Sequence, residues 1–116
     1  MITMDDVLNI ACDVMQVNPD EVLVPQTKKG SRKMELMSAR YFGMYISREL
    51  KLGTFYEIGR FYLRSHCDVI YGIKSLQNEL DTNRQKRELK NIIYSRISAF
   101  TVEYKSDFMD ELLDGE

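Results

Sequence analysis

The sequence predicts an all-α helical bundle, and three observations support this prediction. Apolar residues recur three and four positions apart along most of the chain, which is the spacing of one helix face. No segment alternates between apolar and polar residues in the way that a half-buried strand does. The chain has 116 residues, of which 44% are hydrophobic, and this is enough for one substantial core in a single domain.

Two helices are predicted at the N-terminal end. Thr3 followed by Asp6 is a variant of the capping box, in which a hydroxyl and a carboxylate satisfy free backbone amides at a helix start. The apolar stripe of this helix consists of Val7, Ile10, Ala11 and Val14. Asn18 and Pro19 predict a second, short helix, because asparagine caps helix starts and proline suits the first helical position. Pro25 ends it.

A long helix is predicted from about Arg32 to Leu50, after a loop at residues 26–31. Its apolar positions include Leu36, Ala39, Phe42, Met44, Ile46 and Leu50. Gly53 is expected to close this helix in the left-handed conformation, which glycine adopts without steric cost. Three aromatic residues are expected in the core, with an interface as the alternative: Tyr41, Tyr45 and Phe61.

Two capping boxes then stand close together, Thr54-Phe55-Tyr56-Glu57 and Ser65-His66-Cys67-Asp68. They predict a short helix to about Phe61, a tight turn at residues 62–64 and a longer helix to about Leu80. This order is the helix-turn-helix pattern. Gly59 lies inside the short helix, where glycine costs about 1 kcal/mol relative to alanine, so we expect the two helices to approach closely there.

A final helix is predicted from about Arg84 to Ala99, after an interruption at residues 81–83. Its inward positions are Leu89, Ile92, Ile93 and Ile97. Residues 101–116 are acidic and carry only a weak apolar stripe. We therefore predict a domain at residues 1–102 and an acidic tail at residues 103–116.

The net charge of −2 hides three zones. Residues 1–27 contain five acidic residues and no Lys or Arg, and residues 103–116 contain six acidic residues and one lysine. The zone between them, residues 28–102, contains 15 basic and seven acidic residues. A local excess of positive charge suits a polyanion such as nucleic acid. The alternative is a solvated surface that carries lysines.

Several classes of protein are excluded by what the sequence lacks. No apolar run approaches the roughly 20 residues that span a bilayer, and the first residues lack the pattern of a secretory signal. One histidine and two cysteines in unrelated contexts do not supply a tetrahedral metal site. With no paired acids and no nucleophile beside a base, we expect neither an enzyme nor a cofactor. A reduced, cytoplasmic protein with free thiols is expected.

The second helix of the helix-turn-helix places apolar and polar residues on opposite faces. Its inward face contains Val69, Ile70, Ile73, Leu76 and Leu80, and its outward face contains Cys67, Tyr71, Lys74 and Asn78. DNA-reading helices use their N-terminal residues against base edges in the major groove. Here those residues are Ser65, His66, Cys67 and Asp68, with Arg64 before them, and we expect this group to face outward.

Each of these residues has a structural alternative. Arg64 suits guanine or a phosphate, and Asp68 suits the amino group of cytosine, but an acid at the third helical position also caps the backbone. His66 has no metal partner on its own helix face, so a DNA contact and a partly packed ring remain as alternatives. Cys67 fits a small surface residue better than a redox switch.

Three blocks of sequence resemble the C-terminal DNA-binding domain of the bacterial replication initiator DnaA family. They are RYFGMYISREL at residues 40–50, TFYEIG at 54–59 and LRSHCDV at 63–69. The family pattern runs roughly R-Q-x-A-M-x-L-x-[KR]-E-L, then S-L-x-E-I-G, then G-R-D-H-T-T-V. The resemblance covers about residues 4–100. It implies a Trp-repressor-like helical bundle whose helix-turn-helix reads origin sequences in double-stranded DNA.

The resemblance also implies roles for single residues. Arg32 matches an arginine that enters the minor groove, and Arg40 matches one on the long helix near the DNA. Arg48 stands for a lysine at the phosphate backbone, and Thr54 matches a serine whose neighbourhood meets phosphate. The predicted DNA-contacting residues are therefore Lys28, Lys29, Arg32, Lys33, Arg40, Arg48, Lys51, Thr54, Arg64, Ser65, His66, Cys67 and Asp68.

The chain departs from the family pattern in two ways. Ser65, Cys67 and Asp68 replace the aspartate and the two threonines of R-D-H-T-T, which implies a diverged target site. No G-x-x-x-x-G-K-[ST] motif occurs, so no nucleotide site is expected and the chain is either a fragment or a free-standing domain.

The predicted function is sequence-selective binding of double-stranded DNA at the nucleoid, in replication initiation or its regulation. A protein-interaction module that has lost specific DNA reading is the first alternative, and a Trp-repressor-like transcriptional regulator is the second. The acidic tail is a candidate contact for a protein partner.

Overall fold

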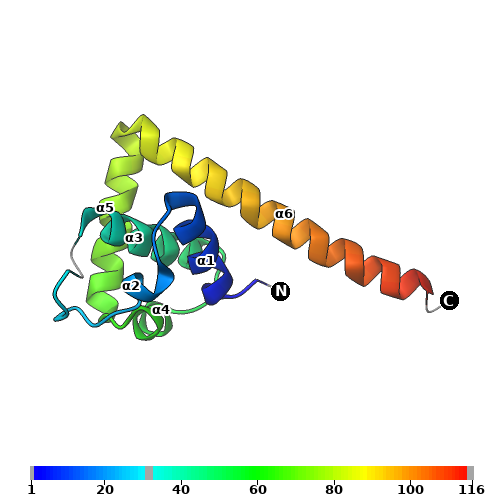
Figure 1. The fold of residues 1–116 in the computed structure, drawn as a ribbon, viewed down its shortest axis with the longest axis horizontal. Helices are drawn as coiled ribbons and strands as arrows, with labels where there is room; N and C mark the ends of the chain where they lie inside the picture. The colour runs from blue at the N-terminus through cyan, green and yellow to red at the C-terminus, as the bar shows by residue number, and fades with distance from the viewer. Residues whose placement is uncertain (1, 31–32, 115–116) are drawn as a thin grey trace.

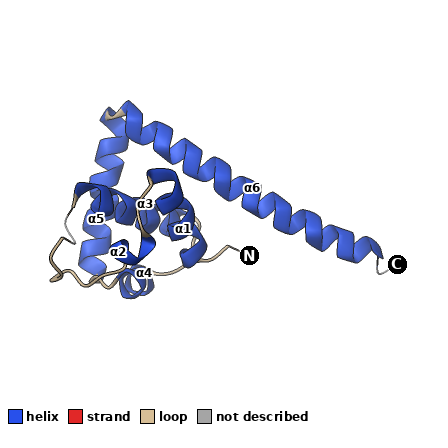
Figure 2. Ribbon diagram, in the orientation of Figure 1, coloured by secondary structure: helices blue, strands red, loops and turns tan. Residues whose placement is uncertain are grey.

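The computed structural model describes residues 2–30 and 33–114, and it describes side chains as far as residue 100. Within these residues the chain is all-helical, which confirms the predicted fold class (Figure 2). The helices are α1 (Met4–Met15), α2 (Pro19–Val22), α3 (Met34–Glu49), α4 (Phe55–Tyr62), α5 (His66–Thr82) and α6 (Arg84–Asp114). None of them combines the length and apolar character that a bilayer-spanning segment needs.

Helix α3 lies at the centre of the bundle and packs most extensively against α1 and α5. Its residues Phe42 and Ile46 are fully buried. The other helices add apolar residues to this core, among them Val7 and Leu8 of α1, Ile58 of α4, Val69 and Leu76 of α5, and Ile93 of α6. Ile92 of α6 was predicted to face inward, but it is 47% exposed. The first half of α6 thus closes the bundle over α1, while its second half extends past the other helices (Figure 1).

The predicted helix starts at the N-terminal end are confirmed. Thr3 Oγ1 accepts a hydrogen bond from the amide of Asp6 at 3.2 Å, and the Asp6 carboxylate accepts one from the amide of Thr3 at 2.9 Å. Asn18 Oδ1 accepts from the amide of Asp20 at 2.9 Å, and Pro19 occupies the first helical position of α2. Local capping chemistry therefore fixes both elements.

The end of α3 differs from the prediction. Lys51, and not Gly53, has the left-handed conformation, with φ of 57°. The amide of Leu52 then donates to the carbonyl of Ser47 at 2.9 Å, which closes the helix two residues earlier than expected. Gly53 lies where an added Cβ would come within 3.2 Å of Glu57 Cβ, so its small size serves the start of α4.

Two further boundaries were predicted wrongly. Tyr62 was placed in a turn, but it is the last residue of α4 and is fully buried in the core. The last helix was expected to end near Ala99, but the helical backbone continues to Asp114. No glycine or proline occurs between Arg84 and Asp114, so nothing in the sequence interrupts the helix. The division at residues 102 and 103 stays a prediction.

The predicted core aromatics are partly right. Tyr45 is buried, with 8% of its surface exposed, while Tyr41 and Phe61 are half-buried against the core. Both cysteines are free: Cys12 is buried, and Cys67 is exposed. Burial raises the pKa of the Cys12 thiol to about 11, so this cysteine is a packed, unreactive side chain.

Candidate nucleic-acid interface

The predicted succession of a short helix, a turn and a longer helix is present as α4, the turn at Leu63 and Arg64, and α5. We call residues 54–68 the α4–α5 elbow. Leu63 has the left-handed conformation, with φ of 58°, and the amide of Arg64 donates to the carbonyl of Gly59 at 2.8 Å. The turn is thereby tied back onto α4.

Gly59 permits this close approach. A Cβ atom added at Gly59 would lie 2.6 Å from the carbonyl oxygen of Arg64, which is a forbidden contact with backbone. We expected Gly59 to allow contact between the two helices. The contact is instead with Arg64 in the turn and with Ser65, the residue that caps α5.

Each helix of the elbow begins at a side-chain cap. Thr54 Oγ1 accepts from the amide of Glu57 at 3.2 Å, and the Glu57 carboxylate accepts from the amide of Thr54 at 3.0 Å. The bond from the Thr54 amide, followed by the contribution of the Thr54 side chain, holds the pKa of the Glu57 carboxyl below its usual value. At α5 only half of the predicted box is present. Ser65 Oγ accepts from the amide of Asp68 at 3.2 Å, but the Asp68 carboxylate does not accept from the amide of Ser65.

The two faces of α5 agree with the prediction at all but one position. Val69, Ile73, Leu76 and Leu80 are buried, and Cys67, Tyr71, Lys74 and Asn78 are exposed. Ile70, which was also predicted to face inward, is only half-buried. At the start of the helix Ser65 and Cys67 are exposed, and His66 and Asp68 are half-buried. The opening turn of α5 is therefore at the surface among the described residues.

Arg64 differs from its predicted orientation. It is half-buried, and its Nη1 donates to the carbonyl of Val24 at 2.7 Å and to those of Leu63 and Tyr62 at 3.1 and 3.3 Å. Burial lowers the pKa of Arg64, while the nearby Asp68 raises it. Arg64 therefore joins the loop after α2 to the elbow from a half-buried position, where we expected it to face outward, and its contact with DNA stays a prediction.

Arg40 is a clearer correction. The resemblance placed it near DNA, but only 3% of its surface is exposed. Its Nε and Nη2 donate to the carbonyl of Val22 at 3.3 and 3.1 Å. Burial, with a smaller contribution from the charge of Arg64, lowers the pKa of Arg40 to about 10. Arg40 fastens the end of α2 to α3 from the inside.

The lysine loop, which we define as residues 25–30 together with Lys33, lies beside the elbow (Figure 1). Lys28, Lys29 and Lys33 are exposed and line a hollow of about 160 Å³ around Gly30. Gly30 has φ of 87°, a conformation that side-chain-bearing residues rarely adopt. The predicted contact Arg32 lies outside the described residues.

A second basic hollow lies at the turn between α3 and α4. It is lined by Arg48, Lys51 and Thr54, together with Leu52, Gly53 and Glu57. The guanidinium of Arg48 lies 4.5 Å from the centre of the Phe55 ring, and its Nη1 donates to the carbonyl of Gly53 at 3.3 Å. Arg48 contacts the α3–α4 turn and is still exposed to solvent. Its structural contact is therefore compatible with a contact to a phosphate.

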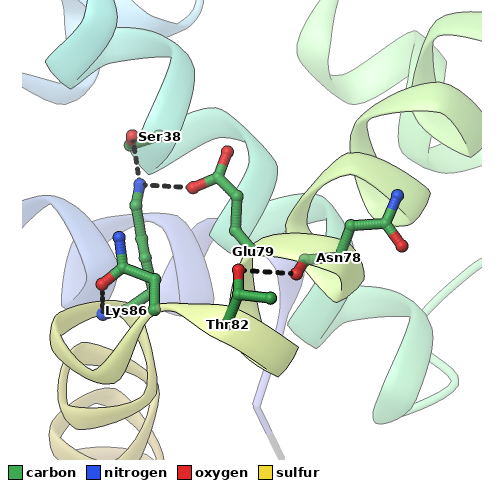
Figure 3. Close-up of polar contacts among 6 residues, drawn as sticks. Ser38, Asn78, Glu79, Thr82 and Lys86 are labelled. Atoms are coloured by element: carbon green, nitrogen blue, oxygen red, sulfur yellow. Dashed lines mark hydrogen bonds and ion pairs between the residues drawn. The ribbon is translucent and has the colours of Figure 1, made fainter.

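Among the described side chains of α6, several basic residues make contacts within the fold. Figure 3 shows the ammonium of Lys86 between Ser38 of α3 and Glu79 of α5, at 2.7 and 3.3 Å. Lys90 donates to the hydroxyl of Tyr45 at 3.4 Å, and Arg96 pairs with Asp13 of α1. The exposed positive charge near the elbow comes from residues outside α6. These are Lys28, Lys29, Lys33, Arg48 and Lys51, together with Arg60 of α4 and Lys74 of α5.

The sequence analysis missed one residue of the elbow. Tyr56 of α4 is 63% exposed, and its ring stacks on the ring of His66, with centroids 4.2 Å apart and planes 24° apart. The available signal was its position within the first capping box, one residue after Phe55 and outside the apolar stripe. The same spacing that turned Ile58 inward left Tyr56 at the surface.

Comparison with known proteins gives a distant similarity. No family model matches the chain. The chromosomal replication initiator protein DnaA of Campylobacter jejuni subsp. jejuni serotype O:23/36 (strain 81-176) is 24% identical over 97 residues, which cover 79% of this chain and 21% of that protein. The DnaA proteins of C. jejuni subsp. doylei and of serotype O:2 give the same values. The chain thus spans about a fifth of the length of these relatives.

Proposed function

We propose that this chain binds double-stranded DNA with sequence selectivity, in the initiation of DNA replication or in its regulation. One arrangement carries the proposal: the first turn of α5 is at the surface, and both basic hollows adjoin the elbow that it belongs to. Arg64 of the elbow bonds to the carbonyl of Val24, which lines the first hollow, and Thr54 and Glu57 of the elbow line the second. The similarity to DnaA supports the same function, since the matched proteins are replication initiators by name. In this proposal α4 and α5 act as a helix-turn-helix, with α5 as the reading helix.

The two hollows are suited to the phosphates on either side of a groove. Lys28, Lys29 and Lys33 are exposed at the first hollow, and Arg48 and Lys51 are exposed at the second. Contacts between such side chains and phosphates release counterions from DNA and supply most of the sequence-independent affinity. We assign the contacts with the bases to the first turn of α5.

The first turn of α5 offers polar groups of different kinds. The Ser65 hydroxyl both donates and accepts, the His66 ring carries one donor and one acceptor when neutral, and the Asp68 carboxylate only accepts. An acceptor in the major groove favours the amino group of cytosine. These residues differ from the R-D-H-T-T pattern, so we propose a target that is distinct from the usual DnaA site.

Arg64 and Arg40 enter the proposal as positioning residues. Arg64 binds the carbonyl of Val24 at the start of the lysine loop, and Arg40 binds that of Val22 just before it. Together they fix the loop relative to α5. The spacing between the phosphate contacts and the base contacts then depends on these two side chains.

The decisive experiment is selection of bound duplexes from a random pool, followed by titration of the selected duplex at several salt concentrations. We expect an enriched motif and a binding constant that falls steeply with salt. Replacing Lys28, Lys29 and Lys33 by alanine should reduce the salt slope by about one for each lost phosphate contact. Arg84→Ala is the matched control, because Arg84 is an exposed cation that pairs with Glu88 on α6. A binding constant that is independent of salt would refute the proposal.

A protein-interaction module is the second candidate, and Asp68 favours it. A carboxylate in the first turn of a reading helix repels phosphates unless it meets a cytosine amino group. Recovery of a defined protein partner, with duplex binding no tighter than millimolar, would support this candidate. For a dimeric transcriptional regulator, the test is the molar mass by light scattering with and without the selected duplex.

We propose that the chain acts at the nucleoid in the cytoplasm and has no enzymatic role. A protein contact through residues 103–116 stays a prediction, because their side chains lie outside the described residues.

A further inference from the structure

We propose that Tyr56 positions the imidazole of His66, and that the pair of rings sets part of the base preference of the reading helix. This inference rests on the proposed function. Tyr56 belongs to α4 and His66 is the first helical residue of α5, so the stack bridges the two helices of the elbow. The ring centroids are 4.2 Å apart and the planes differ by 24°.

The stack is not needed to hold the elbow together. The elbow already has the hydrogen bond from Arg64 to Gly59 at 2.8 Å, and its helices share the buried residues Ile58, Tyr62 and Val69. Tyr56 lies outside this core and keeps 63% of its surface exposed. A large aromatic ring at such a position removes little apolar surface from water, so it adds little to the stability of the core. Its main effect is on the neighbouring ring of His66.

The stack restricts the His66 ring. A histidine at the first position of a helix has several rotamers open to it, because no preceding helical turn limits its side chain. A stacked aromatic neighbour favours one of them by roughly 2- to 10-fold. Cys67 Sγ lies 3.6 Å from His66 Nε2 and borders the ring as well. The two neighbours thus determine which edge of the imidazole, donor or acceptor, faces a base pair.

Tyr56 has a competing role as a direct phosphate contact through its hydroxyl. The two roles differ in what Tyr56→Phe does. A positioning ring keeps its stacking surface in the phenylalanine variant, whereas a phosphate contact loses its donor. Tyr56→Ala removes both, so the pair of variants separates the roles.

The first measurement uses the free protein and does not depend on DNA. His66 is the only histidine, so its ring protons are assigned without ambiguity in an NMR spectrum. Stacking predicts an upfield ring-current shift of these protons in the wild type and in Tyr56→Phe, and its loss in Tyr56→Ala. Tyr71→Ala is the matched control, because Tyr71 is another exposed tyrosine on α5. An unchanged shift in Tyr56→Ala would overturn the stack.

The second measurement compares base preference. Each variant is titrated with the selected duplex and with duplexes changed at single base pairs. We expect Tyr56→Ala to lower the discrimination at one base pair by about 3- to 10-fold, to match His66→Ala there, and to leave the salt slope unchanged. Tyr56→Phe should retain the preference. A uniform loss of affinity in Tyr56→Phe, with a smaller salt slope, would overturn the positioning role in favour of a phosphate contact.

The two proposals fail in different ways. If the wild type binds no duplex, the proposed function fails and base reading by the pair fails with it, while the NMR shift still reports the stack. If the wild type binds selectively but Tyr56→Ala keeps the full preference, only the role of Tyr56 is refuted.

Discussion

Replacing Gly59 by alanine tests the geometry of the elbow most directly. The added Cβ would lie 2.6 Å from the carbonyl oxygen of Arg64, and 3.3 Å from the carbonyl carbon and oxygen of Ser65. All three atoms are backbone, so no side chain can rotate away to make room. The turn must move by at least about 0.4 Å to bring the closest pair to 3.0 Å, which real Cβ atoms almost never undercut.

The expected free-energy change combines two opposing effects. Alanine inside a helix is more favourable than glycine by about 0.5–1 kcal/mol. Overpacking against a fixed neighbour costs about 1–3 kcal/mol. Because the neighbour is the backbone of a turn whose amide already bonds to Gly59 at 2.8 Å, we expect a net loss of about 1–2 kcal/mol in the free energy of unfolding.

Urea denaturation followed by circular dichroism measures this loss. Gly72→Ala is the comparison, since its Cβ would meet the ring of Tyr41 at 2.7 Å, and a half-buried ring can yield more easily than backbone. We therefore expect a smaller loss for Gly72→Ala. At a temperature where both variants are folded, Gly59→Ala should also bind the selected duplex less tightly, because α5 leaves the elbow at a changed angle. A Gly59→Ala protein as stable as the wild type would refute the packing argument.

Three further predictions follow from the described contacts. Arg40→Ala should lower the free energy of unfolding by about 1–3 kcal/mol, because the buried carbonyl of Val22 loses its donors; an unchanged urea midpoint would contradict this. Tyr62→Phe should leave stability unchanged or raise it in thermal unfolding, because the buried Tyr62 hydroxyl has no hydrogen-bond partner among the described residues; a marked loss would reveal a partner. The pKa of Glu57 is lower in the folded chain than in the unfolded chain, so its ionised carboxylate stabilises the fold above the unfolded pKa, and this stabilisation is lost as the pH falls through the folded pKa. Glu57→Gln should therefore flatten this part of the curve of unfolding free energy against pH. An identical curve would contradict the cap.

Much of the fold was predictable because its determinants are local. The capping residues Thr3, Asn18, Thr54 and Ser65 each lie within four residues of the amide that they satisfy, and helical spacing separates the two faces of α5. Even the errors at helix ends have local causes. Lys51 closed α3 before Gly53 was reached, and α6 continued because no glycine or proline interrupts it.

The candidate site was predictable in outline and not in the roles of its arginines. The sequence located the elbow, the lysine loop and the first turn of α5. It assigned Arg40 and Arg64 to DNA because both are basic and lie in the right blocks. In the structure Arg40 donates to the carbonyl of Val22 at the end of α2, and Arg64 donates to that of Val24 just after it, and both carbonyls are more than a dozen residues away in the sequence.

The sequence by itself thus determined the helices, their caps and the distribution of charge along the chain, since each depends on residues a few positions apart. Only the tertiary structure decided which cations reach solvent, that Tyr62 fills the core, and that Tyr56 lies on His66. A long side chain turns inward where packing leaves a distant carbonyl in need of a donor, and that need arises only when separate helices meet.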